Sequence, residues 1–317
     1  MRTGRFAPSP TGDLHAGSLV AALASRCDAA RWRVRIDDVD PPREVPGSAA
    51  RILAALVDHG FPGADAPAER QSAHGERYRE ALEALAAEGL LFACACTRRE
   101  LGGAPGCVGR CRGDAVDVDR LAGLLAPDAP RGAAGVAVRA RLGGALTVTD
   151  RVLGTRALDL DRLAPDATVL RRDGWFAYHL ATAVDDARGI DDVVRGADLL
   201  EATGVQRALM AALGARAPTY AHVPVALGPD GAKLAKGAGA ARLEPTDAVR
   251  SLRAAWRFLG QRPLGDEAGG GDDGGRDGRA AALERFWSLA PARWRMADVP
   301  AVRERPWAGA AVPAGPR

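Results

Sequence analysis

The two lysines of the chain lie three residues apart, in the segment Gly231-Ala232-Lys233-Leu234-Ala235-Lys236-Gly237. Every other cation among its 43 lysine and arginine side chains is an arginine. A lysine ammonium is a compact, mobile point charge, whereas an arginine guanidinium is a planar fork. Because lysine commonly binds phosphate as a point charge, we expect Lys233 and Lys236 to contact phosphate groups. The alternative is that chance has placed the two lysines together.

Four of the five cysteines form a second group with recognisable chemistry. Cys94 and Cys96 precede a glycine-rich segment, and Cys107 and Cys111 follow it, so the chain can fold back and bring the two pairs together. Four thiolates at such spacing suit a structural, tetrahedral Zn²⁺ site with no open coordination position. The alternative is four reduced thiols in a loop. Cys27 stands apart, and we expect it to be a small core residue.

The stretch from Arg5 to Ser18 combines a short apolar run, a loop punctuated by two prolines and Gly12, and the start of an amphipathic helix. It contains neither a GxxxxGK(S/T) phosphate loop nor a GxGxxG dinucleotide fingerprint. Ser18 is a good N-cap for a helix that begins here. His15 and Gly17 would then lie at the positive end of that helix, where phosphate groups bind. The alternative is an ordinary strand-loop-helix unit with a solvated histidine.

Strands and helices alternate along the chain. Alternating apolar residues predict a strand over residues 31–40, with Asp37, Asp38 and Asp40 at its carboxyl end. Apolar residues at helical spacing predict helices over 19–30, 49–59, 75–89, 201–213 and 246–260. This alternation favours an α/β fold with a doubly wound parallel sheet. Ligands bind such sheets at the carboxyl ends of the strands.

The middle of the chain has weaker patterns. Two strands are predicted over residues 136–142 and 146–152, in a small insertion with a possible turn at Gly143-Gly144. Further along, an Asp-Gly turn places Tyr178 near a loop edge, and Arg195 follows a β-branched run that would end a strand. From the residues alone, Tyr178 could equally be a core aromatic and Arg195 a surface cation.

Length and composition set wider limits. The chain has 317 residues, enough for about two or three domains. With 47% hydrophobic and 26% charged residues, it is typical of a soluble globular enzyme. A net charge of +3 is too small to indicate a nucleic-acid partner by itself. Neither a signal-like segment nor an apolar run of membrane-spanning length is present, so we expect a cytoplasmic protein with no membrane partner. We also expect a monomer.

Several motifs together resemble a known family. His15-Ala16-Gly17-Ser18 resembles the first signature of class I aminoacyl-tRNA synthetases, and Lys233-Leu234-Ala235-Lys236 resembles the second. The run from Arg5 to Ser18 is most similar to the glutamyl branch of that class. With the four cysteines, three further segments resemble the glutamyl-queuosine tRNA(Asp) synthetases, which are truncated paralogues of glutamyl-tRNA synthetase: Asp37–Glu44, Phe176–Tyr178 and Val194–Asp198.

The resemblance implies an ATP-dependent ligase with a Rossmann-like catalytic domain, a structural zinc ion, and Mg²⁺ that accompanies ATP. Such an enzyme activates glutamate as glutamyl-AMP and transfers it to queuosine at the wobble position of tRNA(Asp). By the family's pattern, glutamate would be held by Arg5, Phe6, Ala7, Pro8, Ser9, Asp37, Tyr178 and Arg195. ATP would be bound by His15, Gly17, Ser18 and Lys236, with His15, Lys233 and Lys236 as the catalytic residues. The zinc ligands would be Cys94, Cys96, Cys107 and Cys111.

Two positions depart from the family's pattern. Asp37 stands where a glutamate is expected, so its carboxylate reaches one methylene less far toward the α-ammonium of the substrate. Ala235 replaces the usual serine and removes a hydroxyl from the lysine segment.

The resemblance divides the chain into two halves of a catalytic domain, residues 1–92 and 168–240, separated by a zinc-binding insertion at 93–167. A truncated helical region follows at 241–317, with a disordered insert at about 265–279 and a frayed tail. This region is too short for the usual anticodon-binding domain. Two alternatives stay open: a truncated glutamyl-tRNA synthetase that charges a tRNA 3′ end, and a non-catalytic tRNA- or zinc-binding module.

Overall fold

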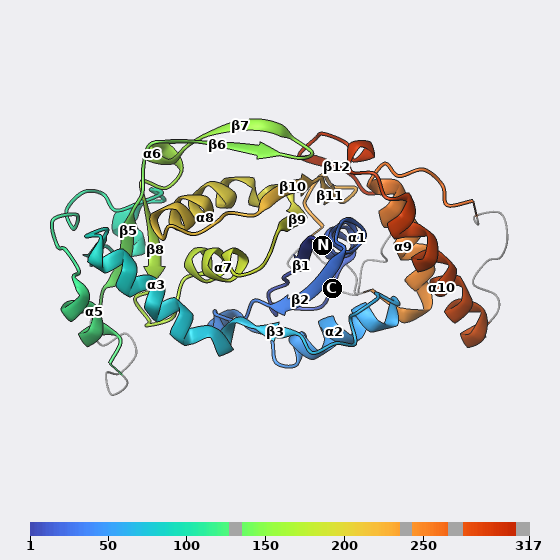
Figure 1. Ribbon diagram of the computed structural model, residues 1–317, viewed down its shortest axis with the longest axis horizontal. Coiled ribbons are helices and arrows are strands. Elements are labelled where there is room, and N and C mark those ends of the chain that lie inside the picture. The colour runs from blue at the N-terminus through green and yellow to red at the C-terminus, as the bar shows by residue number, and fades with distance from the viewer. Residues whose placement is uncertain (127–134, 235–242, 266–274, 309–317) are drawn as a thin grey trace.

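A seven-stranded sheet runs through the molecule (Figure 1). The structure is a computed structural model, and it describes residues 1–126, 135–234, 243–265 and 275–308. In sheet order the strands are β3 (Glu69–Arg70), β2 (Arg31–Ile36), β1 (Thr3–Phe6), β9 (Asp192–Gly196), β10 (Thr219–Val223), β6 (Ala145–Asp150) and β7 (Gly154–Asp159). Neighbouring strands pair in parallel except β6 and β7, which form an antiparallel hairpin. The predicted doubly wound parallel sheet is confirmed.

The strand order reverses between β1 and β9. Helix α1 (Ala16–Asp28) carries the chain from β1 to β2, and α8 (Leu200–Ala212) carries it from β9 in the opposite direction to β10. Helix α2 (Ser48–Asp58) follows β2, and α7 (Tyr178–Ala187) precedes β9. A reversal of this kind opens a crevice outside the carboxyl ends of the strands, where open α/β sheets bind their ligands.

A smaller antiparallel sheet consists of β4 (Leu91–Cys94), β5 (Ala137–Arg141) and β8 (Asp166–Leu170). Because β5 is its central strand, both edges of β5 are already paired, and no edge remains for the strand that follows. The strands predicted over residues 136–142 and 146–152 are found as β5 and β6, but β6 does not stay in an insertion with β5 and instead enters the seven-stranded sheet. Four helices accompany this part of the chain: α3 (Gly75–Ala87), α4 (Arg98–Leu101), α5 (Val118–Leu124) and α6 (Leu160–Leu163).

The C-terminal part contains α9 (Ala248–Phe258) and α10 (Gly275–Arg293), which lie side by side in Figure 1. The prediction of disorder over 265–279 is wrong for residues 275–279, which begin α10, while residues 266–274 lie outside the described residues. The Gly/Asp-rich composition of residues 275–279 does not predict a helix. Helix α10 is stabilised by packing, since Phe286 is buried against Trp256.

The last described strand ties the end of the chain to the catalytic region. Strand β12 (Glu304–Pro306) pairs in parallel with β11 (Val225–Leu227), and the Trp307 N–H donates to the Leu227 carbonyl at 2.9 Å. The frayed tail was predicted to start at Trp307, and this prediction is wrong for Trp307 itself, while residues 309–317 lie outside the described residues.

The largest apolar core lies between α1 and the C-terminal helices. Leu19 and Leu23 are fully buried one turn apart on α1, and Trp256 of α9 belongs to the same cluster. Burying each such leucine stabilises the fold by about 1.5–3 kcal/mol. No helix within the described residues is both long and apolar enough to cross a membrane.

Candidate active site

A cavity of about 430 Å³ opens at the carboxyl ends of β1 and β9, where the strand order reverses. Every predicted glutamate, ATP or catalytic residue that the structure describes lines it: Arg5, Phe6, Ala7, Pro8, Ser9, His15, Gly17, Ser18, Asp37, Tyr178, Arg195 and Lys233. Lys236 lies outside the described residues. The fold therefore gathers in one place residues that are more than 200 positions apart in the chain.

The loop between β1 and α1 forms one wall of the cavity. The N-cap of α1 is His15 and not Ser18 as predicted: His15 Nδ1 accepts from the Ser18 backbone N–H at 3.3 Å, and Ser18 Oγ lies 3.0 Å from His15 Nε2. The imidazole thus performs the capping that a serine hydroxyl usually performs. A Cβ atom at Gly17 would lie only 3.0 Å from the Leu234 carbonyl oxygen, so glycine here lets the lysine segment approach.

Arg5 is a buried cation at the base of the cavity. Its Nε and Nη2 donate to the two carboxylate oxygens of Asp186 at 3.1 and 2.9 Å, and Arg35 Nη1 donates to the same carboxylate at 2.8 Å. Burial opposes ionisation of Asp186, but the two guanidiniums outweigh it and hold the pKa of this carboxyl well below its usual range. The contacts with Asp186 do not use Nη1 of Arg5.

Asp37 follows β2 directly and is also buried. Its carboxylate accepts from Arg35 Nε at 2.7 Å and Nη2 at 3.3 Å, and its backbone N–H donates to the Pro8 carbonyl at 3.0 Å. Burial raises the pKa of Asp37, and the Arg35 guanidinium offsets part of that rise. Carboxylate oxygens have further lone pairs, so the contact with Arg35 leaves capacity to accept hydrogen bonds from a ligand ammonium.

Arg195 lies on β9 and is only 4% exposed. Its Nη2 donates to Thr203 Oγ1 at 2.7 Å and Gln206 Oε1 at 2.8 Å, while its Nε donates to His222 Nε2 at 3.3 Å. The guanidinium also lies 5.5 Å from the ring centroid of Tyr220. Within the described part of the chain, Arg195 Nη1 is buried and has no hydrogen-bond acceptor. An unsatisfied buried donor costs about 1–3 kcal/mol, so an anionic ligand that reaches it would be favoured.

Tyr178 is the first residue of α7, and its ring lies 5.4 Å from that of His179. Burial, together with the nearby Arg195 cation, lowers the pKa of His179 to about 4. His179 is therefore neutral at pH 7 and adds no charge to this side of the cavity.

Lys233 and Leu234, which belong to the described part of the lysine segment, also line the cavity. Lys233 forms an ion pair with Asp198, and both residues line the cavity. The Leu234 N–H donates to the Ala226 carbonyl at 2.9 Å, which anchors the segment to β11. The Lys233 side chain is 47% exposed, so its ammonium can leave Asp198 for a more highly charged anion at small cost.

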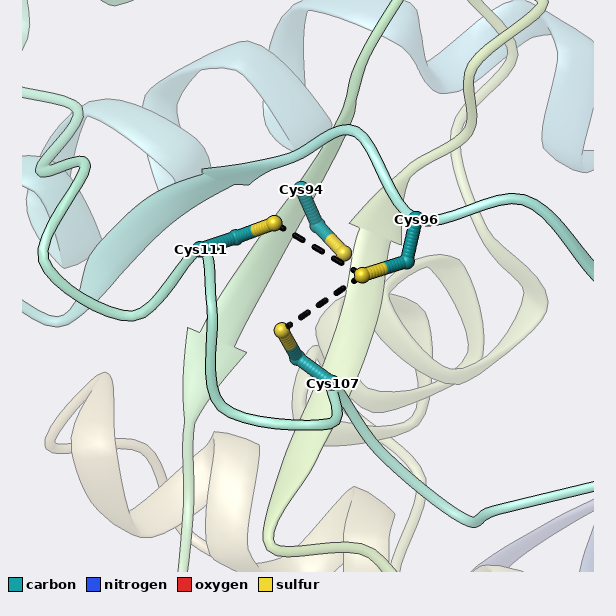
Figure 2. A group of neighbouring side chains, drawn as sticks. All are labelled: Cys94, Cys96, Cys107 and Cys111. Carbon is teal, nitrogen blue, oxygen red and sulfur yellow. Dashed lines mark hydrogen bonds between the residues drawn. The ribbon is translucent and has the colours of Figure 1, made fainter. Parts of the chain in front are cut away.

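The four clustered cysteines lie away from this cavity, around the end of β4 (Figure 2). All are free thiols, and their sulfur atoms lie within 4.8 Å of one another. Cys96 Sγ is 3.9 Å from Cys107 Sγ and 3.6 Å from Cys111 Sγ. Zn–S bonds of about 2.3 Å in a tetrahedron require sulfur spacings close to these, so the four thiols fit such an ion.

The pKa values of two of the thiols, Cys94 and Cys107, are shifted in opposite directions. Burial raises the pKa of Cys94 to about 12. Burial also opposes ionisation of Cys107, but backbone N–H groups of Cys111 and Gly109 outweigh it and lower the pKa of that thiol. Of these two cysteines, Cys107 therefore loses its proton more easily when a metal ion binds.

Comparison with known proteins shows which family combines this fold with these residues. Residues 2–250 match the family described as tRNA synthetases class I (E and Q), catalytic domain. The chain belongs to this family. It is therefore a ligase of the class I synthetase type, and the resemblance predicted from the two signatures is confirmed.

Two curated relatives of this synthetase are named glutamyl-Q tRNA(Asp) synthetase. The one from Aromatoleum aromaticum is 44% identical over 306 residues, covering 94% of this chain and 90% of the relative. The one from Chromobacterium violaceum is 42% identical over 304 residues, covering 94% and 95%. Among solved structures, a glutamate tRNA ligase from Elizabethkingia meningosepticum superimposes with a TM-score of 0.69 at 21% identity, covering 97% of this chain and 67% of that chain. The last comparison supports the fold alone.

The prediction from sequence missed several residues of this synthetase's site. Asp186 and Asp198 were not assigned a role, although they pair with Arg5 and Lys233. A signal for Asp186 was present: two adjacent aspartates interrupt the apolar helix α7, and buried carboxylates require cationic partners. No sequence signal points to Thr203, Gln206 or His222, because their role depends on strands that meet only in the folded sheet.

Proposed function

We propose that this synthetase activates glutamate with ATP to form glutamyl-AMP, and transfers the glutamyl group to queuosine at the wobble position of tRNA(Asp). The observation that carries the proposal is the composition of the cavity. Residues of both class I signatures line it together with two buried arginines, Arg5 and Arg195. The names of the relatives supply the amino acid and the acceptor.

Glutamate has two carboxylates and one ammonium, and the cavity offers groups of complementary charge. We assign the carboxylates to Arg5 and to the unpartnered Nη1 of Arg195, since guanidinium groups bind carboxylates strongly. Asp37 accepts from the α-ammonium, with Tyr178 beside it and the loop of Phe6, Ala7, Pro8 and Ser9 as the wall. Glutamine and aspartate would each leave one buried arginine poorly paired, which disfavours both.

In the first step, an oxygen of the glutamate α-carboxylate attacks the α-phosphorus of ATP, and the bond to pyrophosphate breaks. We propose that His15, Gly17 and Ser18 hold the nucleotide at the positive end of α1, and that Lys233 and Lys236 neutralise the departing phosphates. A Mg²⁺ ion bound together with ATP would supply further positive charge to the departing phosphates. The reaction depends on positioning and charge stabilisation, and no covalent enzyme intermediate forms.

In the second step, a queuosine hydroxyl attacks the carbonyl carbon of glutamyl-AMP. The ester bond to queuosine forms, the bond from the carbonyl carbon to the phosphate oxygen breaks, and AMP leaves as its phosphate takes up the proton that the hydroxyl loses. The names of the relatives support this acceptor.

We also propose that Cys94, Cys96, Cys107 and Cys111 hold one structural Zn²⁺. A zinc ion bound by four thiolates has no open position, so it would tie the end of β4 to the loop beyond α4 and take no part in the reaction.

Glutamate-dependent exchange of pyrophosphate into ATP, without tRNA, tests the first step. We expect exchange with glutamate and not with aspartate or glutamine. Lys236→Ala should reduce it by about tenfold or more, as expected when a charged phosphate contact is lost. Absence of exchange with every amino acid would refute catalysis and favour a tRNA- or zinc-binding module.

Transfer of labelled glutamate tests the acceptor. Label should enter tRNA(Asp) that carries queuosine and not the same tRNA prepared without queuosine. Equal labelling of both would refute the queuosine proposal and indicate a synthetase that charges the 3′ end.

A further inference from the structure

Three polar residues stand side by side on consecutive strands of the sheet. Arg195 of β9 is the cross-strand neighbour of His222 on β10, and Asp150 ends β6 on the other side of β10. All three are buried, with exposed fractions of 4%, 0% and 3%. Buried polar groups are retained at a cost, so a continuous row beside the cavity calls for an explanation.

Asp150 is locked in place as an anion. It accepts from His222 Nδ1 at 2.6 Å and from the backbone N–H groups of His222, Val152 and Leu153 at 3.1, 3.0 and 2.8 Å. Burial opposes its ionisation, but these hydrogen bonds outweigh burial and lower the pKa of the carboxyl. The Nδ1 proton of His222 is therefore committed to Asp150.

Because Nδ1 carries the proton, Nε2 of a neutral His222 can only accept a hydrogen bond. Burial lowers the pKa of His222, the bond to Asp150 opposes that effect, and the Arg195 cation lowers the pKa further. A neutral imidazole that is protonated on Nδ1 has a lone pair on Nε2. That lone pair faces the Nε–H of Arg195 at 3.3 Å.

Thr203 fits the same arrangement of protons. Its hydroxyl donates to the Leu199 carbonyl at 3.1 Å and accepts from Arg195 Nη2 at 2.7 Å, and its oxygen also lies 3.0 Å from His222 Nε2. With its single proton on the Leu199 carbonyl, the hydroxyl leaves the lone pair of His222 to Arg195. Gln206 Oε1 also accepts from Nη2, so two of the three guanidinium nitrogens, Nε and Nη2, have hydrogen-bond partners. The third, Nη1, has no acceptor among the described residues, although Arg195 lines the cavity.

We propose that His222, held by Asp150, is a positioning residue that orients Arg195 toward a substrate carboxylate and so sets the enzyme's affinity for its amino acid. The inference rests on the proposed function, because the ligand of Arg195 is taken to be glutamate. Asp150 contributes in a second way: its negative charge lies one imidazole away from Arg195 and compensates this buried cation when the cavity is empty.

Steady-state exchange kinetics with His222→Leu and His222→Gln test this role. Leucine removes both hydrogen bonds, whereas glutamine retains an acceptor for Arg195. We expect the KM for glutamate to rise about tenfold or more in His222→Leu, as for the loss of one charge-assisted hydrogen bond, with the KM for ATP within about twofold. His222→Gln should recover a large part of the loss.

His59→Leu is the matched control, since His59 is equally buried but lies at the end of α2, outside the cavity lining. It should leave the KM for glutamate unchanged while reporting the general cost of removing a buried imidazole. Equal changes in both KM values of His222→Leu, or an equal change in His59→Leu, would overturn the positioning role. Lack of exchange in the unsubstituted enzyme would instead overturn the proposed function.

The proton arrangement is measurable without any activity. In nitrogen-15 spectra at pH 7, with His222→Gln used for assignment, His222 should appear as a neutral ring with the proton on Nδ1 and none on Nε2. A proton on Nε2 would contradict the proposal even if the kinetic effects were present. The measurement needs only the parent and His222→Gln, so it remains a valid test if His222→Leu fails to fold.

Discussion

At the scale of single residues, the candidate active site of this synthetase contains buried charges that compensate one another. Arg5 and Arg35 share the carboxylate of Asp186, and Asp37 and Asp185 complete the group. Removing one member of a buried ion pair typically costs about 3–5 kcal/mol, because its partner is left uncompensated. The ionised carboxylate of Asp186 therefore compensates the buried cations of Arg5 and Arg35.

We predict that Asp186→Asn lowers the free energy of unfolding by about 3–5 kcal/mol, measured by urea denaturation at pH 7. Glu69→Gln makes the same chemical change in the Arg33–Glu69 pair, where both side chains are nearly half exposed. An exposed pair contributes about 0–1 kcal/mol, so this control should be close to neutral. Similar small losses in the two variants would show that Asp186 does not carry the buried charge balance.

The parent and Asp186→Asn should differ in the free energy of unfolding by an amount that depends on pH. This dependence follows from the pKa of Asp186, which is lowered in the folded protein. A lowered pKa contributes stability above the unfolded-state pKa of about 4, and that stability is lost as the pH falls toward the folded-state pKa. The stability gap between the parent and Asp186→Asn should therefore narrow by up to about 1.4 kcal/mol per pH unit below pH 4. A gap that stays constant from pH 7 to pH 3 would contradict this assignment.

At the scale of elements, the short segment around α4 is stabilised by a few specific polar and thiol contacts. Helix α4 has four residues, and a capping box between Thr97 and Glu100 stabilises its start. The cysteine cluster joins the end of β4 to the loop beyond α4. A metal ion would supply the cohesion that this segment cannot obtain from an apolar core.

We predict about one zinc ion per chain in purified protein by elemental analysis, and a strongly reduced content in Cys107→Ser. Cys27→Ser is the control, because Cys27 is a buried free thiol on α1 outside the cluster. In both the parent and the control, the midpoint of thermal unfolding should fall after zinc is removed by a chelator. Equal zinc content in the two serine variants would refute the four-thiol site.

The elements also show what the sequence could predict. The helices from α1 to α9 that have strong apolar spacing are found within a few residues of their expected bounds, since local periodicity is read from neighbouring residues. Features that depend on distant partners were predicted less well. The strands expected on either side of Gly143-Gly144 are found as β5 and β6, but they enter different sheets, because β4 and β8 occupy both edges of β5. Residues 275–279, which were expected to be disordered, begin α10.

The same distinction holds for the active site. Motif residues such as His15 and Lys233 were predicted because their types and spacing carry the signal, whereas the role of His222 arises only from the order of β9, β10 and β6. The N-cap of α1 shows a further limit: serine is the better N-cap by propensity, but the histidine three residues earlier takes the position.

At the scale of the whole molecule, the chain returns from its far end to brace the active site. Strand β12 pairs with β11, whose Val225 and Ala226 line the cavity, and β11 in turn anchors Leu234 beside the lysines. Arg305 adds a hydrogen bond of 2.6 Å to the Phe258 carbonyl of α9. The C-terminal strand thus connects the helical region to the segment proposed to bind phosphate.

Deleting residues 303–317 should therefore weaken nucleotide binding more than amino-acid binding. Strand β11 would lose its partner strand, so ordering the lysine segment when ATP binds should cost more free energy. An added cost of about 1.4 kcal/mol corresponds to about a tenfold higher KM for ATP. Glutamate contacts residues of β1 and β9 in the proposed complex, so its KM should change by less than about threefold. Deleting residues 309–317 alone keeps β12 and should leave both constants unchanged. If the longer deletion raised the two KM values equally, β12 would act on the stability of the whole domain and not on the lysine segment.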